Sequence, residues 1–154
     1  MSDEFIQRKE LRLCCVSYTD NNSIGSSAYE DLLLGHKHSV VSCNAAAFGS
    51  SNPGDRVIIV APNGKQRYAV LGRIQERLFE CTLWLDKGGM LWNHNYIYEP
   101  LTELFEITPE IKRILEASGE RHRLNERNFF HPRFCSSLLN KIADDLIDHL
   151  TKKA

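Results

Sequence analysis

The sequence predicts an α+β domain in which a small, strongly bent antiparallel sheet or barrel is flanked by helices. Two observations indicate this class. Between residues 56 and 98, several short apolar stretches follow one another with only turns between them. The C-terminal end instead has the spacing of an amphipathic helix. With 154 residues, the chain is long enough to form one domain with a core of its own.

The first part of the chain is expected to contain two strands and one short helix. Residues 12–18 (RLCCVSY) are expected to form the first strand. Ser27 and Glu30 have the spacing of a capping box, in which a hydroxyl and a carboxylate satisfy exposed amides at a helix start. The helix should follow and end near Gly35. Residues 38–44 (HSVVSCN) are expected to form the next strand.

The clearest pattern is a pair of strands joined by a hairpin. NPGD at 52–55 is a turn, residues 56–62 and 67–75 are strands, and NGK between them is a hairpin-type turn. Alternate residues of the second strand should share a face. One face is expected to hold Tyr68, Val70, Gly72 and Ile74, and the other, polar and cationic, to hold Arg67, Arg73, Gln75 and Arg77. Residues 77–85 and 90–98 are expected to be two further strands around the turn DKGG.

The region after Pro100 is expected to be helical. Thr108, Pro109 and Glu110 have the character of a helix start, with a hydroxyl cap, an early proline and an early acid. A polar, arginine-rich connection then leads to an amphipathic helix. Its apolar stripe consists of Leu138, Leu139, Ile142, Leu146 and Leu150. We therefore expect a single domain over 1–154, with a core at about 11–107 and a helical C-terminal cap at about 108–154.

The cysteines, the hydropathy and the first residues of the sequence predict a cytoplasmic protein. The five cysteines show no C-x-x-C spacing, and Cys14 and Cys15 should face opposite sides of a strand. No apolar run reaches membrane length, and the acidic, polar start differs from a signal peptide. His36 and His38 lie near Cys43, but a further ligand at zinc spacing is missing from the sequence. No membrane partner, metal or cofactor is therefore expected.

The stretch GGMLWNHNYIYEP at 88–100 admits two interpretations. One is a packed core strand, which is favoured when the stretch is taken alone. The other follows from the alternating set Trp92, His94, Tyr96 and Tyr98, which is aromatic and amphipathic. In this functional interpretation the rings accept a planar base and Asn or His reads its edge.

Local charge bears on the choice of partner. The formal net charge is −1, so nucleic acid must be bound by a local patch. Between Arg56 and Arg77, five Lys or Arg residues occur with one acid, Glu76, and the segment from Lys112 to Arg133 is also rich in arginine. Such runs are usually solvated surface. A basic strand face beside aromatic residues is nevertheless the combination that phosphate contacts and base stacking require.

The order of these features resembles the PUA-like superfamily, and most of all its EVE and YTH-related branch. The resemblance covers residues 38–107 and is carried by NPGDRVIIVAPNGKQRYAVLGRIQE at 52–76 and LWNHNYIYEPLTELFEI at 91–107. It implies a small bent β-barrel flanked by helices, and the binding of a nucleobase, often a modified one, in a pocket with aromatic walls. Such domains usually carry a tryptophan in the early strand-to-helix region, whereas both tryptophans of this chain come late.

The resemblance also implies site residues. Pro53, Gly54 and Asp55 would form the structural turn. The residues expected at the base-binding pocket are His38, Ser39, Ser42, Asn44, Trp84, Trp92, Asn93 and His94. The charge pattern, independently of the resemblance, predicts that Arg67, Arg73, Arg77, Arg121 and Arg123 contact phosphates.

The expected function is the binding of DNA or RNA, with capture of a nucleobase and without catalysis. Two alternatives stay open. The first is a protein-interaction module or small inhibitor that acts through its C-terminal helix. The second is an enzyme, a metal-dependent nuclease or a hydrolase, that uses His94 or His131. The sequence shows no nucleophile elbow, phosphate-cradling glycine motif or zinc-protease helix.

Overall fold

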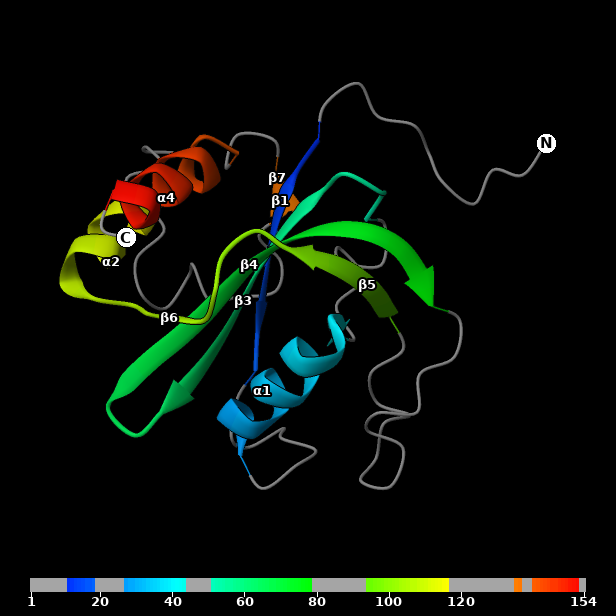
Figure 1. Ribbon diagram of the computed structural model, residues 1–154, viewed down its shortest axis with the longest axis horizontal. Coiled ribbons are helices and arrows are strands. Elements are labelled where there is room, and N and C mark those ends of the chain that lie inside the picture. The colour runs from blue at the N-terminus through cyan, green and yellow to red at the C-terminus, as the bar shows by residue number, and fades with distance from the viewer. Residues whose placement is uncertain are drawn as a thin grey trace.

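The computed structural model describes residues 11–18, 27–43, 51–78, 94–116, 135–136 and 140–152. These residues form three layers, which confirms the α+β class (Figure 1). The helix α1 (Ala28–His38) covers one face of a sheet. The helices α2 (Pro109–Glu116) and α4 (Asn140–Lys152) cover the other face.

The middle layer is a seven-stranded sheet. Its strands are β1 (Leu13–Ser17), β2 (Val40–Cys43), β3 (Arg56–Asn63), β4 (Gln66–Leu78), β5 (His94–Pro100), β6 (Phe105–Glu106) and β7 (Cys135–Ser136). The pairing order is β2-β5-β4-β3-β1-β7, and β6 pairs with β4 outside this path. The hairpin of β3 and β4 confirms the predicted strand pair. The first two residues of the strand expected at 77–85 belong to β4, and the rest of it lies outside the described residues.

The strand β1 pairs with β3 in parallel, so the expectation of an antiparallel sheet is wrong at this pair. Leu13 lies opposite Arg56, and Ser17 lies opposite Val60. Parallel neighbours cannot be joined by a tight turn and need a crossover connection. Here α1 and β2 lie in that connection. The turn pattern after residue 56 predicted the antiparallel neighbours of β4 but contained no information on the partner of β1.

The sheet is buried on both faces. On one face, Val16 of β1, Ile59 of β3 and Tyr96 of β5 belong to the same buried cluster as Leu32 of α1. On the other face, strand residues pack with α2 and α4 through Ile111, Ile142 and Leu146, among others. Cys14 belongs to the first cluster and Cys15 to the second, so the prediction that these thiols face opposite sides of a strand is confirmed.

The sheet is bent but open. Among the described residues, the terminal strands of the pairing order, β2 and β7, do not pair with each other, so a closed barrel is not confirmed. A side chain bridges part of the opening. The Ser42 backbone N–H, on β2, donates to the hydroxyl of Tyr18, which follows β1, at 3.3 Å. Figure 1 shows the strong curvature of β4.

The start of α1 is as predicted, but its end is not. The Glu30 N–H donates to Ser27 Oγ at 3.2 Å, which caps the helix. The helix runs past Gly35 to His38, and Ser39 ends it in the left-handed conformation (φ 57°, ψ 40°). A glycine inside a helix costs only about 1 kcal/mol relative to alanine, so Gly35, which is buried in α1, does not by itself end the helix.

The two helices on the opposite face also follow the predicted pattern. The Ile111 N–H donates to Thr108 Oγ1 at 3.2 Å, so Thr108 caps α2 as expected. In α4, Ile142 and Leu146 of the predicted stripe are buried against the sheet, and Leu150 packs at the edge of the same cluster. The described part of the stripe therefore belongs to the protein's own core. Leu138 and Leu139 lie outside the described residues.

The turn before β3 is held by a buried carboxylate. Asp55 is fully buried, and its two oxygens accept the backbone N–H groups of Arg12 and Asn52, both at 2.9 Å. The Arg12 Nε lies 3.8 Å from the same carboxylate. Because Arg12 immediately precedes β1, these contacts fix the start of β1 beside the start of β3. Gly54 provides the positive φ of 95° that the turn requires.

Replacement of this carboxylate should destabilise the fold. We expect Asp55→Ala to lower the free energy of unfolding by about 1–3 kcal/mol for each buried donor that loses its acceptor. Urea unfolding followed by circular dichroism measures this change. Asp55→Asn keeps one amide oxygen as an acceptor and should cost less. A stability of Asp55→Ala within about 0.5 kcal/mol of wild type, the range of an ordinary surface substitution, would contradict this role.

Gly72 allows a tyrosine to pack directly on the backbone of β4. A Cβ at this position would lie 2.3 Å from Tyr98 Cδ2, closer than any normal contact. Tyr98 is 1% exposed and lies in the buried cluster under α1, so the ring has little room to move.

We therefore expect Gly72→Ala to lower the free energy of unfolding by about 1–3 kcal/mol through overpacking. The double variant Gly72→Ala/Tyr98→Leu should show a destabilisation smaller than the sum of the two single changes, because the smaller side chain removes the clash. Thermal or urea unfolding of the four proteins measures this coupling. Additive effects would show that the close approach does not limit residue 72.

Candidate nucleic-acid interface

A β-bulge near the end of β4 determines which way its last arginine faces. Ile74 pairs with Tyr98 and Arg77 pairs with Tyr96, with a register shift between Ile74 and Glu76. Tyr96 and Tyr98 share a face, so Arg77 lies on the same face as Ile74, the face covered by α1. The prediction that Arg77 shares the face of Arg73 is therefore wrong, because one extra residue in a strand inverts the alternation that follows it.

The bulge brings the Arg77 guanidinium over the ring of Tyr96. The Arg77 Cζ lies 5.6 Å from the ring centroid, and Arg77 Nη1 donates to the Tyr96 hydroxyl at 3.4 Å. Arg77 is half-buried, whereas Tyr96 is fully buried. The ring and the hydroxyl of Tyr96 thus hold the Arg77 guanidinium at the end of the sheet, where β4 ends and β5 begins.

Tyr96 remains a neutral phenol in this contact. Burial raises the pKa of Tyr96 above its ordinary value of 10.0, although the Arg77 charge and a hydrogen bond from the Ser51 backbone act in the opposite direction. A neutral phenol positions the guanidinium without cancelling its charge.

Further polar groups are buried in this part of the sheet. Cys14 Sγ lies 3.8 Å from Ser51 Oγ, and Ser51 is 2% exposed. On β2 and β5, Ser42 Oγ donates to Asn95 Oδ1, and Ser42 is fully buried. We call Arg77, Tyr96 and Ser51 the β5 polar cluster, and the pair of Ser42 and Asn95 lies at the next position along β5. Sequence reasoning missed Ser51 and Asn95, because the pairing of Ser42 with Asn95 depends on a cross-strand register that no local pattern reveals.

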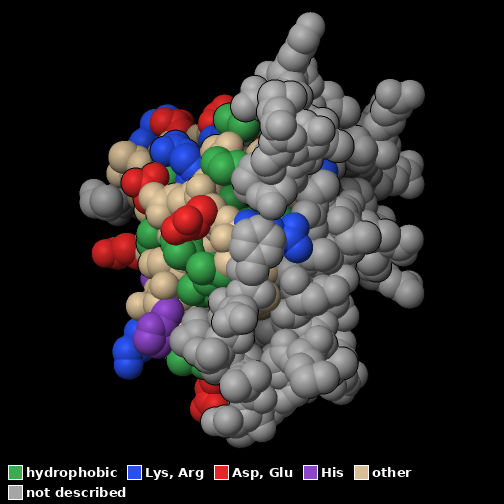
Figure 2. All heavy atoms as spheres, turned by 90° about the vertical axis from the view of Figure 1, so that its right-hand side faces the viewer, with side chains coloured by type: hydrophobic (Ala, Val, Ile, Leu, Met, Phe, Trp, Pro, Cys, Tyr) green, Lys and Arg blue, Asp and Glu red, His purple; other side chains and the backbone are tan. Residues whose placement is uncertain are grey.

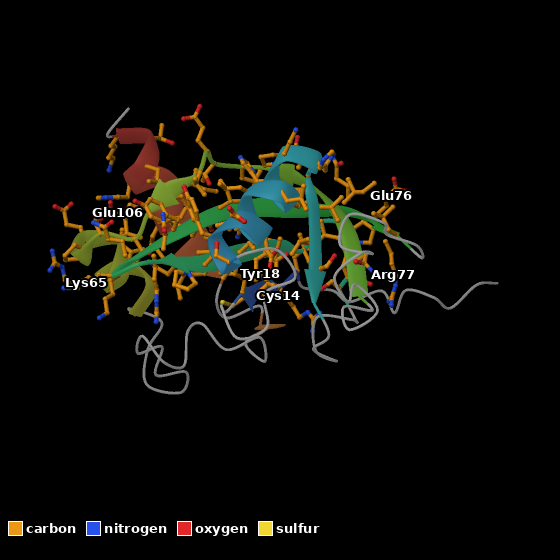
Figure 3. The ribbon with its side chains drawn as sticks, turned by 90° about the horizontal axis from the view of Figure 1, so that it is seen from below. Cys14, Tyr18, Lys65, Glu76, Arg77 and Glu106 are labelled. Atoms are coloured by element: carbon orange, nitrogen blue, oxygen red, sulfur yellow. The ribbon has the colours of Figure 1, made fainter. Side chains whose placement is uncertain are left out.

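The other two candidate arginines on β4 have different surroundings. Arg73 lies on the α4 side of the sheet and forms an ion pair with Glu99 at 3.2 Å, with both side chains about half exposed. Arg67 lies near the hairpin with Lys65, which Figure 3 places at the opposite end of the sheet from Arg77. The three arginines therefore do not form one cationic strip.

The candidate base-binding residues that the structure describes are partly brought together. Ser42 of β2 pairs with Asn95 of β5. His38 is the exposed last residue of α1, and Ser39 is the helix end whose carbonyl accepts the Tyr98 N–H at 2.9 Å. His94 is the first residue of β5. Asn44, Trp84, Trp92, Asn93, Arg121, Arg123 and the alternative catalytic residue His131 lie outside the described residues.

Tyr96 and Tyr98 do not form a stacking face. Both are buried in the cluster beneath α1, at 0% and 1% exposure. The Tyr98 hydroxyl lies 3.1 Å from His36 Nδ1, and burial raises the pKa of Tyr98. Within the described part of 88–100, the packed-strand interpretation is therefore confirmed, and the proposed stacking role is wrong for these two rings.

The charge on the surface beside β5 is mixed. Figure 2 shows Lys and Arg side chains interspersed with Asp and Glu where described residues form this face. Within the described ranges, no group of three His, Cys, Asp or Glu side chains is placed to hold a metal ion. The same part of the chain contains no helix that is long and apolar enough to cross a membrane.

No family model, curated protein or solved structure matches this chain. The resemblance to the PUA-like superfamily therefore stays a prediction from the sequence.

The hydroxyl of Tyr96 provides a pH-dependent test of the β5 polar cluster. Folding raises the pKa of Tyr96 above the value of about 10 that the residue has in the unfolded chain. The neutral Tyr96 hydroxyl therefore contributes fully to stability below about pH 10, and its contribution decreases as the pH rises further. The difference in unfolding free energy between wild type and Tyr96→Phe should therefore decrease between pH 9 and pH 11, which urea unfolding measures. It should stay constant from pH 6 to pH 8. A difference that is equally large at pH 8 and pH 11 would contradict the burial of this phenol.

Proposed function

We propose that the protein is a PUA-like, cytoplasmic nucleic-acid-binding module that captures a nucleobase, including a modified one, without catalysing a reaction on it. The observation that supports the proposal is the placement of Arg77. Its guanidinium lies over a neutral, buried tyrosine at the end of the sheet, and this contact orients the positive charge. An oriented guanidinium can bind a phosphate through two parallel hydrogen bonds.

Two other arginines of the sheet, Arg73 and Arg56, are less suited to bind a phosphate. Arg73 lies 3.2 Å from Glu99, and Arg56 lies 2.6 Å from Asp144 of α4. A phosphate at either position competes with a carboxylate that already lies beside the cation.

The base is proposed to stack on a tryptophan. Trp92 lies two residues before His94, where β5 begins, and β5 pairs with the part of β4 that carries Arg77. Trp92, or Trp84 from the same connection between β4 and β5, would stack on the base, with Asn93 and His94 as readers of its edge. This division separates the phosphate contact from the base contact, so each can be removed by its own substitution.

We expect the protein to bind oligonucleotides at low salt, which fluorescence anisotropy over a salt series measures. Arg77→Gln should reduce the slope of log affinity against log salt by about 0.7 for single strands or about 0.9 for duplex, the loss of one phosphate contact. The matched control Arg73→Gln should change the slope less, because Glu99 already pairs with that cation.

Trp92→Ala should weaken binding by about 1–3 kcal/mol and leave the salt slope unchanged. The panel should contain single- and double-stranded DNA and RNA, with and without modified bases. If the wild-type protein binds none of these at low salt, or if Arg77→Gln leaves the salt slope unchanged, the proposed phosphate contact is wrong.

A further inference from the structure

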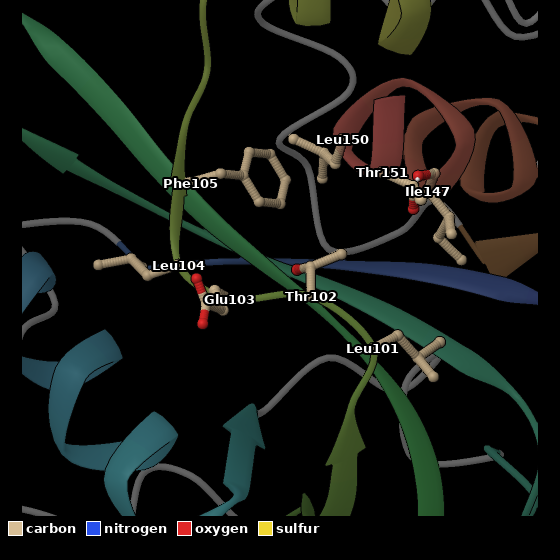
Figure 4. Close-up of a pocket in the computed structure, with 8 residues that line it drawn as sticks. All are labelled: Leu101, Thr102, Glu103, Leu104, Phe105, Ile147, Leu150 and Thr151. Atoms are coloured by element: carbon tan, nitrogen blue, oxygen red, sulfur yellow. Dashed lines mark hydrogen bonds between the residues drawn. The ribbon is translucent and has the colours of Figure 1, made fainter. Parts of the chain in front are cut away.

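A second candidate site lies on the α4 side of the sheet, away from Arg77. A hollow of about 530 Å³ opens between the segment 101–105 and the last turns of α4 (Figure 4). The hollow is next to β6, whose Glu106 lies at the opposite end of the sheet from Arg77 in Figure 3. It is therefore separate from the β5 polar cluster.

The hollow results from an irregularity in how the chain pairs with β4. Pro100 of β5 lies opposite Gly72, and Phe105 of β6 lies opposite Ala69. Four residues, 101–104, thus span a distance that two residues span on β4, and the segment must arch away from the sheet.

Hydrogen bonds hold the arch in place. The Leu101 and Thr102 N–H groups donate to the Leu71 carbonyl at 2.8 and 3.3 Å, and the Leu71 N–H donates to Thr102 Oγ1 at 3.1 Å. The side chain of Thr102 thereby replaces the backbone acceptor that a regular ladder would supply. These bonds fix the first two residues of the arch, Leu101 and Thr102, against β4.

The walls of the hollow are mainly apolar. The Phe105 ring projects from the arch toward Leu150 of α4, and Leu101 and Ile147 line the same space (Figure 4). All four side chains are half-buried. Apolar walls around a space of this size suit a small organic molecule.

The polar groups at the hollow favour a positively charged ligand. Glu103 is exposed, and no cation within the described residues pairs with its carboxylate. The Thr151 hydroxyl donates to the Ile147 carbonyl at 2.7 Å and keeps its lone pairs as acceptors. The last turn of α4, which contributes Leu150 and Thr151, also carries the partial negative charge of a helix C-terminus, and Lys152 of the same turn is paired with Asp148 at 3.0 Å.

We propose that this hollow binds a small apolar molecule that carries a primary amine. The apolar body lies between Phe105 of the arch and Leu150 of α4, and the ammonium group pairs with the Glu103 carboxylate at the rim. Charge complementarity distinguishes this ligand from a neutral or anionic molecule with the same body.

Three probes with an indole body test the proposal: tryptamine, tryptophol and indole-3-acetate. Titration of the full chain, followed by methyl NMR signals of Leu101, Ile147 and Leu150, should show tryptamine binding about two- to fivefold more tightly than tryptophol, the range of an exposed ion pair. Indole-3-acetate should bind more weakly than tryptophol.

Two variants test the contributions of the charge and of the apolar walls to binding one at a time. Glu103→Gln should reduce the affinity for tryptamine to that for tryptophol, whereas Glu106→Gln, an exposed acid outside the hollow, should leave it unchanged. Leu150→Trp should fill the hollow and abolish binding of all three probes. The proposal is overturned if no probe shifts these signals, if the acid binds as tightly as the amine, or if Glu103→Gln retains the preference for the amine.

Discussion

The fully buried carboxylate of Asp55 is the constraint on which the arrangement of the sheet depends. It accepts the backbone N–H groups of Arg12 and Asn52, so a single side chain fixes both the entry into β1 and the turn into β3. This matters because β1 and β3 are parallel, and no tight turn sets their register. Once β1 is fixed beside β3, the connection through α1 and β2 must cross the sheet. That crossing places α1 over one face and leaves β2 to pair with β5.

Two irregularities in the pairing of β4 then create both candidate sites. At one end, the bulge between Ile74 and Glu76 brings Arg77 to the α1 side of the sheet, over Tyr96. At the other end, the arch at 101–104 moves the chain away from β4 and opens a space beside α4. The long strand β4 supports both sites because it is hydrogen-bonded along both edges. A regular ladder would have placed Arg77 beside Arg73 on the opposite face and would have left no hollow.

The sequence predicted well those features that depend on neighbouring residues. Ser27 and Thr108 cap their helices as their spacing indicated, and the hairpin at NGK joins the two expected strands. The face that holds Tyr68, Val70 and Ile74 packs against α1 as the alternation required. The aromatic alternation of 94–98 was ambiguous, because an aromatic strand face can pack under a helix or accept a base. Burial of Tyr96 and Tyr98 beneath α1 resolves this ambiguity.

The sequence alone therefore determined the local elements: where the caps lie, which strands form the hairpin, and which alternate residues share a face before the bulge. Only the tertiary structure decided the parallel partner of β1, the side on which Arg77 lies, the pairing of Ser42 with Asn95 and the hollow beside α4. The physical reason is the range of the interactions. Caps and hairpin turns are set by residues a few positions apart. Register is set by contacts between distant segments, and a shift of one residue inverts every side chain that follows.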